Sequence, residues 1–532
     1  MSTLFYNATV FTGTQSSAEA FVVSDGRFSF VGSLMHAILR SPYAQRVNLG
    51  GRFVCAGFND SHMHLLNLGL SLGQAQLDKP SLNEVLLELE SFAKRHPDLP
   101  FIQGRGFNED HYLSGEKRFA VRDELDAACP DKPCMITRVC GHVAVANSKA
   151  LEMAGISSRA PYVEGGSVDT DENGRPTGVL RENAIFLVSS IIPKPDRNAI
   201  KECLMLAMEH VNRYGITSVQ TDDFSSLDVP FEEILRAYQE LKNEGLMRVR
   251  VTEQCFLPTL ESLNAFLQAG YMSGVGNEWL RIGPLKLLAD GSLGARTAYL
   301  RNPYSDAPDT RGIPVYTKDS LSELILAAHH AGMQIAVHTI GDGAVEMALD
   351  AFGKAQASCR RPDARHGLVH AQIVDSAQAD AMAELHLHAY IQSIFLDYDT
   401  RIVSQRLGSR AQEAYPAASL LRRQATLSNG SDCPVEPPDV LAGIQCAVTR
   451  KPYTPCEGGA YLPHESLSIS NALKSFTSWG AYASFEEDKK GLIQTGYLAD
   501  FVVLDANPFK TASSSLHSIP IWGVYLAGNR IL

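Results

Sequence analysis

Two histidines separated by a single residue stand out early in the chain. His62 and His64 follow the apolar run of residues 53–58. Side chains two residues apart on a strand point to the same face, so the two imidazoles would be directed at one point. Neutral imidazole is the commonest metal ligand in proteins. Two histidines in a polar loop would give the same pattern, and the interpretation therefore depends on whether the rest of the chain supplies further ligands.

A single lysine interrupts an otherwise uncharged run later in the chain. Lys286 lies within residues 282–289, and every other residue of this run is uncharged. Burying a lone ammonium is costly, and burial lowers the pKa of lysine. One interpretation is a lysine that extends to solvent or pairs with Asp290. The other is a neutral amine that captures carbon dioxide, giving a carbamate able to bridge two metal ions.

Eight short apolar runs predict the scaffold that would position these residues. From the second run onward they alternate with helical stretches, which is the rhythm of repeated βα units. Eight such units indicate a (β/α)8 TIM-like barrel of the α/β class. The predicted strands are residues 53–58, 215–219, 248–252, 282–288, 334–338, 367–370, 389–392 and 425–429.

Polar residues stand on or after several of these strands. Active sites of (β/α)8 barrels lie at the carboxyl ends of the strands. Nitrogen and oxygen ligands that converge from separate strands are what a catalytic divalent metal requires. The candidates, in strand order, are His62 and His64 (first), Lys286 (fourth), His338 (fifth), His370 (sixth) and Asp432 (after the eighth).

The segments outside the strand pattern predict two further parts of the molecule. The gap between the first and second strands is too long for one crossover, which indicates an inserted α+β subdomain. Both ends of the chain are rich in short β-like runs that could pair with each other. We therefore predict a composite β-sandwich from residues 1–56 and 483–532, a barrel from residues 57–75 and 193–482, and an inserted subdomain at residues 76–192.

The composition narrows the class of protein. The 532 residues are 45% hydrophobic and 20% charged, as in an ordinary globular protein. A net charge of −12 argues against a nucleic-acid or anionic-membrane partner, because such surfaces attract an excess of Lys and Arg. No apolar run approaches the roughly 18 residues of a membrane span, and no signal-peptide pattern opens the chain. Ten cysteines without C-x-x-C spacing predict reduced thiols and a cytoplasmic location.

The candidate ligands together resemble those of a known family. His62-x-His64, Lys286 before Asp290-Gly291-Ser292-Leu293-Gly294, then His338, His370 and Asp432, are similar to the motifs of the amidohydrolase superfamily. The segment of residues 141–148 more narrowly resembles the YtcJ-like branch, which includes N-substituted formamide deformylases. The resemblance extends over nearly the whole chain.

The resemblance implies a metal centre and a reaction. One divalent ion, zinc being expected, would be held by His62 and His64, and a second by His338 and His370. One or both of these sites would be filled, and with two ions a carboxylated Lys286 would bridge them. Asp432 would lie near the first ion as the general base. The implied activity is hydrolysis of an amide-type C–N bond of a small molecule, other than a peptide bond, by metal-activated hydroxide.

Several further residues and functions remain as alternatives. His142 would contact substrate or be a structural loop histidine, and Arg296 would bind a carbonyl or carboxylate or fix its own loop through an ion pair. A metal-dependent lyase or decarboxylase on the same barrel, or a non-catalytic protein that keeps the fold, are the competing functions. Homodimers are common in the family, so a homodimer is a candidate assembly. The other histidines near the strands are predicted not to be ligands: His329, His330, His366, His386 and His388.

Overall fold

The computed structural model describes residues 2–14, 17–138, 143–156, 159–163, 165–455 and 458–532. The chain divides into two compact units. One comprises Met1–Asn67 and Ala207–Leu532, and the other comprises Leu68–Leu206, which contains the residues predicted as the inserted subdomain. Two helices, α2 (Leu65–Leu72) and α7 (Arg197–Asn212), lie across the sequence boundaries of these units. Among the described helices, none has both the length and the apolar character needed to cross a membrane.

The first unit contains the predicted TIM-like barrel. Eight strands pair in parallel in the order β19-β18-β17-β16-β15-β14-β13-β6. Their positions confirm the repeated βα pattern of the sequence. The strands are β6 (Phe58–Met63), β13 (Ile216–Thr221), β14 (Arg250–Phe256), β15 (Leu280–Leu288), β16 (Ile335–Thr339), β17 (Gly367–His370), β18 (His388–Ile391) and β19 (Thr426–Asn429).

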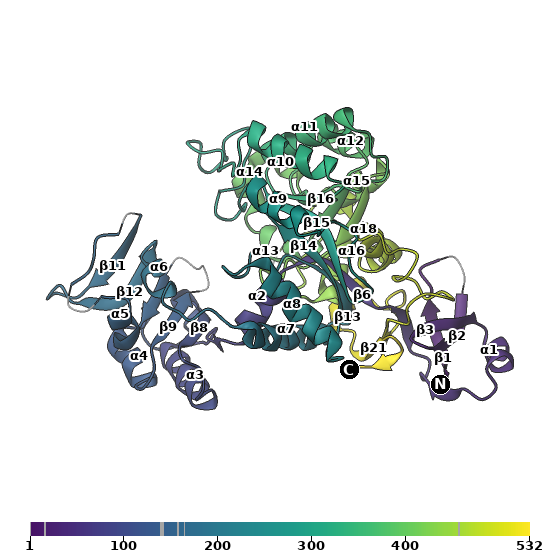
Figure 1. The fold of residues 1–532 in the computed structure, drawn as a ribbon, viewed down its shortest axis with the longest axis horizontal. Helices are drawn as coiled ribbons and strands as arrows, with labels where there is room; N and C mark the ends of the chain where they lie inside the picture. The colour runs from purple at the N-terminus through teal and green to yellow at the C-terminus, as the bar shows by residue number, and fades with distance from the viewer. Residues whose placement is uncertain (1, 15–16, 139–142, 157–158, 164, 456–457) are drawn as a thin grey trace. The chain divides into compact units, whose positions relative to one another are not determined.

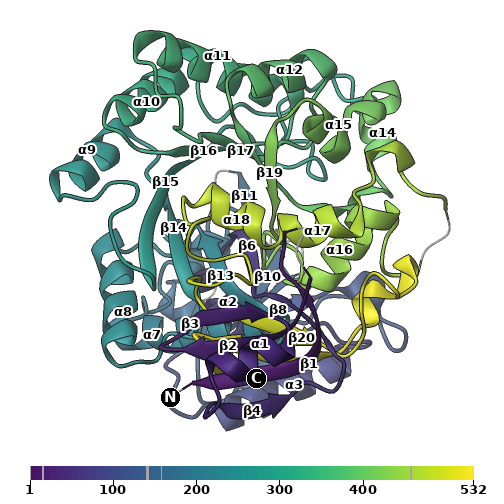
Figure 2. The same cartoon turned by 90° about the vertical axis from the view of Figure 1, so that its right-hand side faces the viewer.

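Helices follow the barrel strands along the chain. Figure 2 shows α9 to α12 in an arc outside strands β15 to β19. The helices that follow the strands are α8 (Phe231–Asn243), α9 (Leu260–Gln268), α10 (Lys318–His330), α11 (Asp342–Ser358), α12 (Ser376–Glu384), α13 (Leu396–Asp399), α14 (Val403–Leu407), α15 (Ala417–Arg422), α16 (Val440–Thr449), α17 (Ile469–Ser475) and α18 (Ser478–Ala483).

Backbone hydrogen bonds connect the first barrel strand, β6, with the loop that follows the last strand, β19. The Asp432 amide donates to the His62 carbonyl at 2.8 Å, and the His64 amide donates to the Cys433 carbonyl at 2.8 Å. Gly430 permits this approach, because a Cβ there would lie 2.5 Å from the His62 amide nitrogen. The Asp60 carboxylate adds bonds from the Ser431 amide at 3.0 Å and the Ser431 hydroxyl at 2.5 Å. The backbone therefore places the H-x-H segment beside Asp432.

The apolar run of residues 53–58 is not one barrel strand, and in this detail the sequence prediction was wrong. Strand β5 (Phe53–Ala56) pairs with β1 and β20 in the terminal sheet, whereas β6 begins at Phe58 and enters the barrel. The chain changes sheets at Gly57, where a Cβ would lie 2.1 Å from Thr217 Oγ1. Both strands are buried along their whole length, and Phe58 at the start of β6 continues the apolar sequence of β5 across Gly57. His62 consequently lies within its strand.

Segments from both ends of the chain share one sheet in the order β22-β21-β20-β5-β1-β2-β3, with β4 beside β1. An aromatic cluster fills one face, with Phe5 stacked on Phe21 and Phe501 stacked on Tyr525. The elements are β1 (Thr3–Phe11), β2 (Ser17–Ser24), β3 (Arg27–Gly32), α1 (Leu34–Arg40), β4 (Gln45–Asn48), β20 (Phe501–Leu504), β21 (Ile521–Leu526) and β22 (Asn529–Arg530).

A buried ion pair ties the barrel to this terminal sheet. Arg250, at the start of β14, donates from Nε and Nη2 to the Asp500 carboxylate at 2.6 and 3.0 Å, and both residues are at most 5% exposed. An Arg250→Leu variant would leave the Asp500 charge buried without its partner. We expect the free energy of unfolding to fall by about 3–5 kcal/mol. Chemical denaturation followed by circular dichroism measures this change.

The matched control is Arg236→Leu, which removes an exposed pair with Glu233 on helix α8. Such surface pairs contribute about 1 kcal/mol or less. Equal losses in the two variants would contradict a stabilising role for the buried pair.

The second unit is a mixed sheet covered by helices on both faces (Figure 1). Alternate residues of β9 and β10 face two separate cores: Cys134, Ile136 and Val145 pack with α3 and α4, whereas Met135 and Ala144 pack with α5 and α6. The elements are β7 (Ala75–Gln76), α3 (Leu82–Arg95), β8 (Ile102–Phe107), α4 (Arg122–Ala128), β9 (Cys134–Arg138), β10 (Val143–Ala146), α5 (Ser148–Met153), β11 (Gly166–Thr170), β12 (Pro176–Glu182) and α6 (Ile185–Ser189).

Candidate metal centre

The six predicted ligands lie together at the carboxyl end of the barrel. Asp432 Oδ1 lies 3.3 Å from His62 Nε2 and 3.2 Å from His64 Nε2. The Lys286 Nζ atom lies 3.1 Å from the same His62 Nε2. On the neighbouring strands, His370 Nε2 lies 3.0 Å from His338 Nδ1. Ligand atoms of His62, His370 and Asp432 all fall within 4.8 Å of one another, which is the spacing that one bound ion requires.

Two buried amides fix the orientation of two of the imidazoles. The Gln254 side chain donates through Nε2 to the Ser61 carbonyl at 3.1 Å, which leaves its Oε1 to accept from His62 Nδ1 at 2.7 Å. In the same way, Gln392 donates to the Tyr390 carbonyl at 2.9 Å and accepts from His370 Nδ1 at 2.7 Å. In both histidines the proton is therefore on Nδ1, and Nε2 presents a lone pair to the centre.

Backbone carbonyls fix the other two imidazoles. His64 donates from Nδ1 to the Asp222 carbonyl at 3.0 Å, and His338 donates from Nε2 to the Gly291 carbonyl at 3.2 Å. The remaining nitrogen of each ring faces the centre. Metal-binding histidines characteristically donate their outer N–H to an oxygen in this way.

The residues present fit a divalent metal. With their outer nitrogens protonated, His338 and His370 direct two lone pairs at each other across 3.0 Å. The inner nitrogens of His62 and His64 likewise face a carboxylate oxygen of Asp432. Lone pairs held this close repel each other unless a cation or a proton lies between them. Three or more imidazole nitrogens with one carboxylate oxygen form the donor set typical of catalytic zinc.

Lys286 is fully buried, and burial lowers the pKa of its ammonium. It does not pair with Asp290, the partner considered from the sequence. The Asp290 carboxylate instead accepts from the backbone amides of Tyr299, Ile340 and Gly341 at 2.8 to 3.0 Å. Asp290 thus joins the loop after β15 to the loop after β16. Lys286 lies beside His62 instead, with its Nζ atom 3.1 Å from His62 Nε2.

The charge state of Asp432 follows from its neighbours. Burial alone would raise the pKa of this carboxyl, but its contacts with His62 and His64 outweigh burial and hold the pKa well below its usual range, because a proton or cation held between Oδ1 and the two Nε2 atoms favours the carboxylate. Asp432 is therefore a carboxylate at neutral pH, as a proton acceptor must be.

The remaining predicted residues lie elsewhere or outside the described residues. Arg296 donates to the Asp306 carboxylate at 3.1 and 2.9 Å, and Arg406 also pairs with Asp306. This arrangement matches the loop-fixing alternative. His142 lies outside the described residues. His329 bonds to His366 at 2.8 Å, away from the six ligands, and His388 bonds to Ser428 at 2.8 Å.

Sequence reasoning missed the residues that orient the ligands, chiefly Gln254, Gln392 and Asp60. Each lies on, or directly after, a barrel strand and is buried. A buried amide in an apolar strand is a weak signal, since many such amides serve only the fold. Gln392 follows the strand next to that of His370, Gln254 lies two strands away from His62, and Asp60 shares a strand with His62, so no single spacing rule finds all three.

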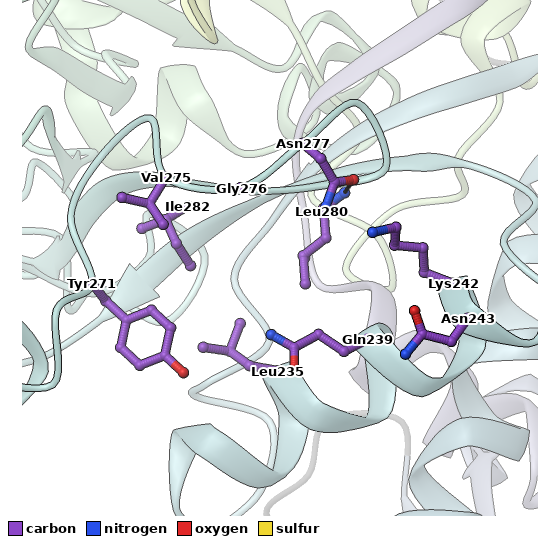
Figure 3. A pocket seen from close by; sticks show the side chains of 10 residues that line it. All are labelled: Leu235, Gln239, Lys242, Asn243, Tyr271, Val275, Gly276, Asn277, Leu280 and Ile282. Carbon is purple, nitrogen blue, oxygen red and sulfur yellow. Dashed lines mark hydrogen bonds between the residues drawn. The ribbon is translucent and has the colours of Figure 1, made fainter.

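A second cavity of about 260 Å³ lies on the same unit but outside this centre (Figure 3). It opens between α8 and the segment that leads into β15, at the amino end of that strand. Its side chains include Leu235, Lys242, Tyr271 and Leu280, and Lys242 is its one charged residue. Its lining residues include no set of metal-binding side chains, and it lies away from the carboxyl end of the barrel, where the candidate ligands gather.

Comparisons with known proteins agree with this geometry. The Amidohydrolase family pattern matches residues 45–532. YtcJ of Bacillus subtilis (strain 168) is 32% identical over 532 residues, covering 98% of this chain and 97% of YtcJ. The N-substituted formamide deformylase of Arthrobacter pascens is 26% identical over 539 residues, covering 99% and 97%. The crystal structure of an uncharacterized metal-dependent hydrolase from Pyrococcus furiosus superposes with a TM-score of 0.80 at 30% identity, covering 96% of this chain and 100% of that one.

Proposed function

The chain belongs to the amidohydrolase family, and we propose that it cleaves an amide-type carbon–nitrogen bond of a small molecule in a metal-dependent hydrolysis. The observation that carries this proposal is the convergence of four oriented imidazoles and the Asp432 carboxylate on one point. A relative that spans the same length is named for removing formyl groups from N-substituted formamides, which supports this bond type.

The chain's own residues suggest how the metal is held. His62 and His64 would bind one ion, and His338 and His370 a second, with Asp432 beside the first. When bound, zinc would supply a Lewis acid that acidifies water and polarises a carbonyl. Gln254 and Gln392 keep the inner nitrogens unprotonated and directed at the ion.

Lys286 is suited to bridge the two histidine pairs. Its amine is buried and lies 3.1 Å from His62 Nε2. A neutral amine adds to carbon dioxide, and the carbamate formed would offer two oxygens as ligands. We include carboxylation of Lys286 in the proposal. Intact mass spectrometry under native conditions, with and without bicarbonate, detects the added carbon dioxide.

Asp432 carries the proton transfer. Its carboxylate would accept a proton from the attacking water as the new carbon–oxygen bond forms. The same proton would then pass to the leaving nitrogen as the carbon–nitrogen bond breaks, so that the products are a carboxylic acid and an amine. Cys433 is buried next to this residue, but the mechanism uses no thiol nucleophile.

The test is a substrate panel of N-formyl and N-acyl amines, assayed with zinc-replete protein in water enriched in oxygen-18. We expect release of the free amine with one heavy oxygen in the acid. Release of carbon dioxide without heavy oxygen would instead indicate a lyase and would overturn the proposal.

A further inference from the structure

One buried arginine near the metal centre has no carboxylate partner among the residues that the structure describes. Arg450 follows helix α16, and its side chain is 2% exposed. Its Nε donates to the Tyr461 carbonyl at 3.0 Å, while its buried Nη2 has no hydrogen-bond partner. Among the residues that the structure describes, no carboxylate lies within ion-pair distance of this guanidinium.

The neighbouring charges do not neutralise Arg450. Glu465 attracts it at longer range, but the Glu465 carboxylate already accepts bonds from Ser419 and Arg422. Burial lowers the pKa of Arg450 to about 10, so it still carries its charge at neutral pH. The other buried arginine of the barrel, Arg250, has a bidentate partner in Asp500. A buried charge without a partner is costly, which indicates that Arg450 is kept for a ligand.

Arg450 lines a small cavity that also touches His370, one of the six candidate metal ligands. The cavity walls include His370, Gln392, Ser393, Tyr415 and Arg450. His370 is a candidate ligand and Gln392 orients it. The Tyr415 hydroxyl is bound to Asp399 and does not compete for the guanidinium. The space measures about 10 Å³, which is the volume one water molecule needs.

We propose that Arg450 binds a carboxylate of the substrate, and that the substrates are N-acylated amino acids or similar amides with a carboxylate close to the scissile bond. The inference rests on the proposed function, because it names the substrate class of the same site. Guanidinium and carboxylate match in charge and in planar geometry. The small cavity has room for one ligand oxygen.

Paired substrates test this inference. N-formylglycine and N-formylalanine would be compared with their carboxamides, which keep the scissile bond and remove the charge. A charged hydrogen bond contributes about 1.5–3 kcal/mol, which corresponds to roughly 10–150-fold. We expect wild-type kcat/KM to favour the carboxylates by at least about 10-fold, and Arg450→Met to lower kcat/KM for the carboxylates alone by that factor. Arg450→Lys should restore part of the preference.

The matched control is Arg423→Met, which removes an arginine paired with Asp380 outside the cavity and should leave the preference unchanged. Equal kcat/KM for acids and carboxamides in the wild-type protein would overturn the carboxylate site while leaving the proposed function intact, even if Arg450→Met failed to fold. If no amide is hydrolysed, the same compounds serve as ligands in calorimetry. Binding of N-formylglycine that is lost in Arg450→Lys and Arg450→Met, but kept in Arg423→Met, would then support the site although the proposed function had failed.

Discussion

Replacing Asp432 with Asn is expected to lower kcat by about 10³-fold, within the range usual for loss of a general base. The asparagine amide has nearly the same shape as the carboxylate and can still lie beside the imidazoles of His62 and His64. It cannot accept a proton from water. A proton or cation held between Asp432 and the inner nitrogens of His62 and His64 favours the carboxylate, and an asparagine offers no charge for it to stabilise. Steady-state kinetics on the best substrate of the panel, with metal content determined on the same sample, measures the effect.

The control for this substitution is Asp505→Asn, which changes an exposed aspartate paired with Arg52 in the terminal sheet. It should leave kcat within about twofold, as expected of a surface pair. An Asp432→Asn protein that bound metal and kept wild-type kcat would show that another group moves the proton.

Replacing Lys286 with Ala is expected to lower kcat/KM by at least about 100-fold, since it would remove the proposed bridging ligand and disturb its neighbours. Acetate or propionate added to the assay should restore part of the activity, because a free carboxylate can occupy the space of the proposed carbamate. The same acids should not raise the activity of the wild-type protein. Lys242→Ala, which removes an exposed lysine from the barrel exterior, serves as the control.

Activity of Lys286→Ala near the wild-type value would exclude Lys286 from the centre. A large loss without any recovery in the acids would retain Lys286 as an essential residue but would contradict the carbamate.

The barrel, and the grouping of the candidate ligands at one end of it, were predictable because they follow from two regular patterns. Buried parallel strands appear as short apolar runs, and repeated βα units space these runs along the chain. Barrel geometry then brings residues as distant in sequence as His62 and Asp432 to the same end of the barrel. The ligand types themselves, imidazole and carboxylate, indicated the chemistry.

What the sequence could not reveal depends on the packing between strands. The crossing at Gly57 divides one apolar run between two sheets, and only the close approach of Thr217 explains why glycine stands there. Gln392 orients His370 from the neighbouring strand, whereas Gln254 on β14 reaches His62 on β6 across the intervening strand β13; both relations depend on strand register. The partners of Asp290 could not be predicted either, because they are backbone amides, which every residue type except proline provides.

The measurement that tests the metal centre most directly is the metal content of the purified chain by inductively coupled plasma mass spectrometry. It would be compared with a His62→Asn/His370→Asn variant whose fold is verified by circular dichroism. The ligand geometry predicts one or two divalent ions per wild-type chain and a loss of both metal and hydrolysis in the variant. A variant that keeps its metal, or a metal-free wild-type chain that hydrolyses amides at the full rate, would contradict this assignment.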